Sequence, residues 1–129
     1  MSDIHDNEII SYKVNLKNHT LTLLTVGDHA SETQVLFSGV LAHMFETQLE
    51  GSIIMDIQKY ELEYFIRNNF DLLEKQKKSS WPLDYKTSEE LYNILLSEKY
   101  IYYVVFSSYG LSGWVLAKDL EIVNICTLE

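Results

Sequence analysis

Hydrophobic and polar positions alternate along the first part of this 129-residue chain. Tyr12, Val14 and Leu16 alternate with polar residues, and residues 20–26 repeat the same two-residue period. That period places every second side chain on one face of a half-buried strand. The polar stretch 17–19 between them contains an asparagine, which tolerates turn geometry. The pattern therefore predicts a hairpin near the N-terminus.

A longer β segment is expected over residues 33–46. The hydrophobic positions before Gly39 have one parity and those after it have the other. A glycine at such a change often marks a β-bulge or a bend. We therefore expect one long, bent third strand, followed by a turn over residues 47–51.

Residues 52–57 predict a fourth strand, with Ile53, Met55 and Ile57 on one side of it. Asp56 is expected on the opposite side. Its expected structural role is to reach solvent at the end of the strand or to help start the helix that follows. A general-acid role for Asp56 would require a second carboxylate and a cleft.

Helical spacing begins near Tyr60, where hydrophobic residues recur every three or four positions over residues 60–73. Pro82 disfavours helical geometry at the residue before it, so the first helix must end before this point. A second helix is expected to begin at Thr87. Glu90 follows three residues later and completes the sequence of a capping box.

The last third of the chain is rich in aromatic and β-branched residues, which favour strands. Residues 100–107 predict a central strand, residues 109–113 a hairpin connection and residues 114–117 the returning strand. Residues 120–125 predict a further strand or a tail packed on the sheet.

Strands and helices are thus segregated along the sequence, which favours an α+β fold over parallel βαβ winding. We expect a mainly antiparallel sheet of six or seven strands, with two helices inserted between strands four and five. The length fits a single domain over residues 1–129, with residues 1–8 as a flexible start.

The composition favours a soluble, cytoplasmic protein. Cys126 is the only cysteine, so no intrachain disulfide can form, and this suits a reducing compartment. The first residues lack the basic and apolar regions of a signal peptide. No apolar run reaches the roughly 18 residues that a transmembrane helix needs.

Acidic residues outnumber lysine and arginine by 19 to 10, which gives a net charge of −9. This excess argues against binding to the phosphates of nucleic acid or to an anionic membrane, because both require clustered basic residues. It suits a basic protein partner.

The common catalytic motifs are missing from the sequence. Five glycines cannot form a dinucleotide fingerprint or a phosphate loop, and no histidine lies in a zinc-protease pattern. We therefore expect no cofactor and no metal, and an enzyme is not the favoured class. The alternative is an enzyme or small-ligand-binding protein with a pocket between sheet and helices near His43, lined also by Asp56, Tyr103 and Trp114.

The strongest local signal is a run of acids between residues 46 and 63, opposed only by Lys59. If these residues share one rim of the domain, they form a surface that attracts a basic partner. This predicts a small binding or inhibitor protein, and a subunit that dimerises through an open sheet edge is a further possibility. The predicted partner-binding residues are Glu46, Glu50, Asp56, Glu61 and Glu63.

The segment 107–118, which reads SSYGLSGWVLAK, resembles small bacterial proteins that have no assigned activity. In size and acidity the whole chain resembles immunity proteins of bacterial toxin–immunity systems. The second resemblance implies a protein that occludes a basic toxin domain. It assigns no role to any individual residue.

Overall fold

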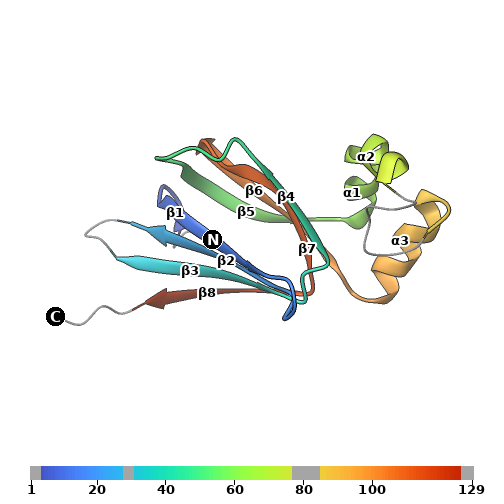
Figure 1. Ribbon diagram of the computed structural model, residues 1–129, viewed down its shortest axis with the longest axis horizontal. Coiled ribbons are helices and arrows are strands. Elements are labelled where there is room, and N and C mark those ends of the chain that lie inside the picture. Colours follow the sequence, from blue (N-terminus) through green and yellow to red (C-terminus); the bar gives the residue numbers. More distant parts are fainter. Residues whose placement is uncertain (1–3, 28–30, 77–84, 126–129) are drawn as a thin grey trace.

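The structure is a computed structural model, and it describes residues 4–27, 31–76 and 85–125. Eight strands and three helices occur in these residues (Figure 1). In chain order they are β1 Glu8–Asn15, β2 Thr20–Val26, β3 Glu32–Ser38, β4 Ala42–Glu46, β5 Ile53–Tyr60, α1 Leu62–Asn68, α2 Phe70–Gln76, α3 Ser88–Ser97, β6 Ile101–Tyr109, β7 Ser112–Ala117 and β8 Asp119–Ile125.

All eight strands belong to one antiparallel sheet with the order β4-β7-β6-β5-β1-β2-β3-β8. Two four-stranded halves meet where β5 and β1 pair, and the register there includes only Glu8 opposite Ile53. Because this junction is short, the halves diverge from it and face each other (Figure 1). Lys118 alone links β7 to β8 and donates its backbone N–H to Ser38.

The first core fills the space between the two halves. It combines buried aliphatic and aromatic side chains from β1, β2 and β3 with others from β5, β6 and β7. Phe37 and Tyr103 are its largest fully buried members, and their ring centroids lie 5.4 Å apart. Ile4, close to the start of the chain, is also fully buried in this core.

A second core lies on the other face of β6 and β7, under the helices. Phe65 of α1 contacts Tyr102 of β6 and Trp114 of β7, with ring centroids 5.3 Å and 5.0 Å apart. Tyr102 and Tyr103 are adjacent and therefore enter different cores. We call the face that contacts the helices the helix-side face.

The structure confirms an α+β fold with an antiparallel sheet, but the expected numbers of strands and helices are wrong. The segment 33–46 forms two strands, β3 and β4, instead of one bent strand. Gly39 has a φ of 63° in the connection between them, a conformation that glycine adopts readily. The helices consequently lie between the fifth and sixth strands.

The single helix expected over residues 60–73 is also wrong, because α1 ends and α2 begins around Asn69. The backbone of Asn69 is not helical, and its side-chain amide donates a 3.0 Å hydrogen bond to the carbonyl of Phe65. The hydrophobic spacing continues through this interruption, so periodicity alone did not reveal it.

The predicted start of the last helix is confirmed. Thr87 is the N-cap of α3, and its hydroxyl accepts the backbone N–H of Glu90 at 3.1 Å. The Glu90 carboxylate accepts the backbone N–H of Lys86 at 2.8 Å. The helix break expected at Pro82 and the lone thiol of Cys126 lie outside the described residues.

Among the described residues, no helix is both long enough and apolar enough to cross a bilayer.

Replacing Phe65 with alanine should destabilise the fold by about 3–5 kcal/mol, because the second core loses its central ring. Replacing Phe70, which is 51% exposed, should cost less than about 1 kcal/mol. Urea unfolding followed by circular dichroism measures both free energies. Equal losses for the two variants would show that the helices do not pack as described.

Candidate functional site

A β-bulge in β5 determines which way Asp56 points. The register with β6 shifts between Ile54 and Asp56, so Met55 is an extra residue on this strand. Ile54 and Ile57 are both buried in the first core, although strict alternation would place them on opposite faces. The prediction that Ile53, Met55 and Ile57 share one side is therefore wrong.

Beyond the bulge, Asp56, Gln58 and Tyr60 lie on the helix-side face. They pair with Phe106, Val104 and Tyr102 of β6, and residues directly opposite in an antiparallel pair share a face. Val104 and Tyr102 pack in the second core, which fixes the side of the sheet. Asp56 is thus presented on the outside of the sheet, on the same face as the helices.

A groove of about 330 Å³ follows this part of β5. We call it the β5 groove, and it is lined by His5, Met55, Asp56, Gln58, Tyr60 and Phe106. Met55 and Tyr60 are 42% and 38% exposed, so the groove has apolar as well as polar walls.

Hydrogen bonds hold the polar wall of the β5 groove. The Asp56 carboxylate accepts the backbone N–H of Ile57 at 2.8 Å and the side-chain amide of Gln58 at 3.2 Å. The Tyr60 hydroxyl donates to the Gln58 side-chain carbonyl at 3.3 Å. A carboxylate has about four lone-pair positions, so Asp56 retains acceptor capacity for a ligand.

Aromatic rings surround Tyr60. Its ring centroid lies 6.3 Å from those of Phe106, Tyr64 and Tyr102. The Tyr60 and Phe106 planes are inclined at 67°. Two inclined rings beside a carboxylate form a suitable environment for a cationic side chain, because the ring faces attract positive charge.

The N-terminal residues complete the acidic surroundings of the groove. His5 Nδ1 lies 2.8 Å from the carbonyl oxygen of Met55, the extra residue of the bulge. Asp6 donates its backbone N–H to Ile54, and its carboxylate lies 3.5 Å from His5 Nε2. Sequence reasoning did not identify His5, Asp6, Gln58 or Phe106, because their proximity to Asp56 depends on the bulge and on pairing between distant segments.

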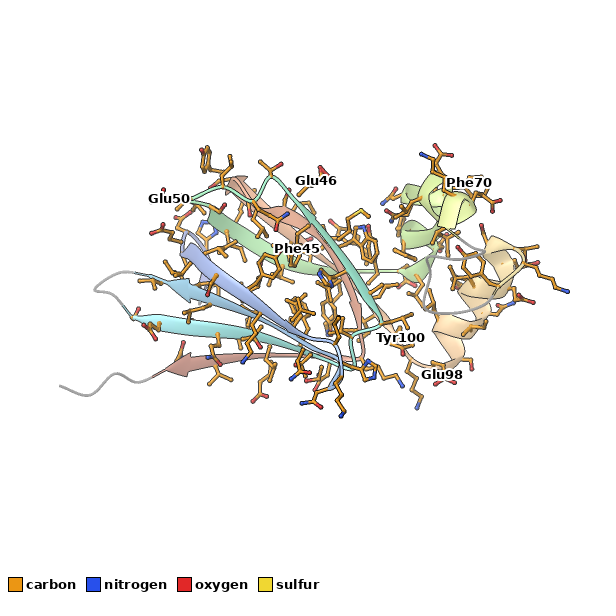
Figure 2. All side chains as sticks on the ribbon, in the orientation of Figure 1. Phe45, Glu46, Glu50, Phe70, Glu98 and Tyr100 are labelled. Carbon is orange, nitrogen blue, oxygen red and sulfur yellow. The ribbon has the colours of Figure 1, made fainter. Side chains whose placement is uncertain are left out.

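The five predicted acids do not form one compact patch. Glu46 and Glu50 lie at the end of β4 and in the turn after it, and Figure 2 shows both away from the helices. Glu61 and Glu63 lie at the start of α1, beyond the far end of β5. Glu50 precedes β5 and Glu61 follows it, so the eight residues of this strand separate these two acids by about 25 Å at the usual rise of a strand. Glu46 lies near the level of Asp56, but on β4, three strands away across the sheet.

The two acids on α1 also differ from each other. Arg67 lies 3.5 Å from the Glu63 carboxylate and above the Tyr64 ring, 5.4 Å from its centroid. This contact partly neutralises Glu63. Glu61 directly follows Tyr60, which lines the β5 groove. Of these two acids, Glu61 is therefore the one closer in sequence to the groove.

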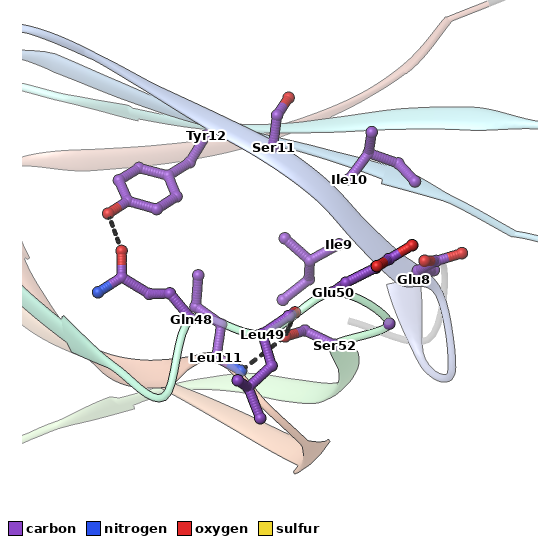
Figure 3. A pocket seen from close by; sticks show the side chains of 11 residues that line it. Glu8, Ile9, Ile10, Ser11, Tyr12, Gln48, Leu49, Glu50, Ser52 and Leu111 are labelled. Atoms are coloured by element: carbon purple, nitrogen blue, oxygen red, sulfur yellow. Dashed lines mark hydrogen bonds between the residues drawn. The ribbon is translucent and has the colours of Figure 1, made fainter.

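Glu50 belongs to a second groove of about 480 Å³, between β1 and the turn after β4. Figure 3 shows β1 along one side of it and residues 48–50 along the other. Ile10 and Leu49 are each about half exposed in its walls, and Glu8 adds another acid. The Tyr12 hydroxyl donates a hydrogen bond to the Gln48 side chain across this groove.

Ser52 fixes the turn that borders this second groove. Its hydroxyl donates to the Leu49 carbonyl at 2.6 Å and accepts the Leu111 backbone N–H at 2.9 Å. Gly110 has a φ of 83°, and a Cβ there would lie 2.1 Å from the Ser52 hydroxyl oxygen. The turn between β6 and β7 therefore requires glycine at position 110.

The residues of the alternative pocket are divided between the two faces of the sheet. His43 and Tyr103 both lie opposite Val115 in the register, so they share the face of the first core. Trp114 lies on the helix-side face, against Phe65. His43 instead lines a hollow of about 190 Å³ beside the β1–β2 turn.

The described residues contain no group of three or more histidine, cysteine, aspartate or glutamate side chains arranged to hold a metal ion.

In comparisons with known proteins, no family model and no curated protein matches this sequence.

Burial lowers the pKa of the His43 imidazole below its ordinary value of 6.5. The folded protein therefore binds this proton less readily than the unfolded chain does, and the free energy of unfolding should fall as the pH drops from about 6.5 towards the folded-state pKa. Urea unfolding at neutral and mildly acidic pH tests this. The His43→Gln variant should lose less stability on acidification than the wild type, and equal losses would contradict the assignment.

Proposed function

We propose that this chain is a binding protein that covers a basic surface of a protein partner, with the β5 groove as its anchoring site. The observation that supports this most strongly is the position of Asp56, which lies in an open groove with Met55, Tyr60 and Phe106. An acidic group beside partly exposed aromatic and apolar side chains suits a lysine or arginine of a partner.

The overall charge supports the same class of partner. A net charge of −9 accelerates encounter with a basic protein and repels nucleic acid and anionic membrane. Around the β5 groove, Asp6 and Glu61 add negative charge at exposed positions. Charge would therefore govern the rate of association, and the contacts within the groove would govern the rate of release.

The mechanism is occlusion. A basic side chain of the partner packs against the exposed surfaces of Tyr60 and Phe106 and pairs with Asp56, while the adjoining surface of α1 covers the partner around it. An immunity protein that blocks a basic toxin domain would act in this way. Glu46 and Glu50 then lie at the periphery of the contact, where charges affect association more than affinity.

Capture from a lysate of the source organism at low salt tests the proposal, followed by calorimetry with the purified protein that is retained. The retained protein should be basic, and salt should release it. Asp56→Asn preserves the shape of the side chain but removes its charge, and it should weaken binding by roughly tenfold.

Glu89→Gln is the matched control, because it removes one negative charge from an exposed position on α3. It should change the affinity less than about twofold. Retention of no basic protein, or equal affinity for Asp56→Asn and the wild type, would contradict the proposed site.

A further inference from the structure

The sheet has two edge strands, β4 and β8. In the described part of the chain, no other strand pairs with the outer side of β8, which runs along the margin of the fold in Figure 1. An edge strand presents backbone N–H and C=O groups that can pair with another chain. β4 has five residues, whereas β8 has seven and offers the longer edge.

β8 has few of the features by which proteins usually protect an edge. Its sequence, DLEIVNI, contains no proline, lysine or glycine. Its register with β3 is continuous from Ser38 opposite Asp119 to Glu32 opposite Ile125, so no bulge twists the strand away. Acidic residues occur only at Asp119 and Glu121.

We infer that β8 pairs antiparallel with β8 of a second copy of this chain, about a twofold axis at Ile122. Such a pairing uses all seven residues and is self-complementary. It places Glu121 opposite Val123 and Asp119 opposite Ile125. No two like charges lie directly opposite each other, which removes the main local penalty in a cross-strand pair.

The face of β8 that is directed towards the first core fits the same register. Leu120 and Ile122 pair with Phe37 and Val35, are partly buried and pack against the first core. At the twofold axis the two Ile122 side chains lie opposite each other, so each covers the exposed part of the other. The first cores of the two copies are then adjacent across a continuous sheet.

This inference is independent of the proposed function, because β8 is four positions away from β5 in the sheet order. Salt separates the two associations. Each copy has a net charge of −9, so screening should strengthen the dimer. The same screening should weaken binding to a basic partner.

Sedimentation over a range of concentrations, at low and high salt, tests the dimer with opposite substitutions at one position. Val123→Glu opposes Glu121 of the second copy with a like charge, twice by symmetry, and should weaken the dimer by roughly tenfold. Val123→Lys removes the same apolar side chain but provides an opposite charge, so it should bind at least as tightly as the wild type. Circular dichroism and urea unfolding of each variant check that the monomer fold is retained.

Cysteine cross-linking tests the register. In a Cys126→Ser background, Ile122→Cys should oxidise to a covalent dimer, because the two introduced thiols face each other at the axis. Glu121→Cys is the matched control, because its partner across the axis is Val123. A monomer at every concentration, equal effects of the two Val123 substitutions, or equal cross-linking of the two cysteine variants would overturn the inference.

Discussion

The register shift at Met55 is the feature on which the proposed surface depends. Ile54 and Ile57 both enter the first core only because one extra residue lies between them. The two buried side chains fix the strand on either side of the bulge, and Asp56 consequently points outward. The carbonyl of Met55 lies within hydrogen-bond distance of His5, so the bulge also holds the N-terminal residues beside the groove.

The middle of the sheet is buried on both faces, and this determines where the surface remains open. Tyr103 packs between the two halves, whereas Tyr102 and Trp114 pack under the helices. The helices follow β5 directly and cover the end of the half-sheet around Tyr102. Asp56 and Phe106 lie farther along the strands, away from these helices. They therefore border the open β5 groove, and α1 begins just after Tyr60, which also lines it.

Local patterns predicted much of the fold and little of the site. Alternation and capping chemistry predicted the first hairpin and the Thr87 N-cap, because both depend on neighbouring residues. The bulge at Met55 has no local signature, since pairing with the distant strand β6 defines it. The helix interruption at Asn69 involves a local hydrogen bond to Phe65, which the spacing of hydrophobic residues does not show. The run of acids was visible, but its distribution along β5 depends on the fold.

Hydrogen–deuterium exchange on the protein, with and without its captured partner, tests the central claim most directly. If the β5 groove anchors a basic partner, amides of residues 55–64 and those around Phe106 should exchange more slowly in the complex. Residues 8–12 and 48–52 at the second groove should change little. Slower exchange confined to the second groove, or to α3, would contradict the account.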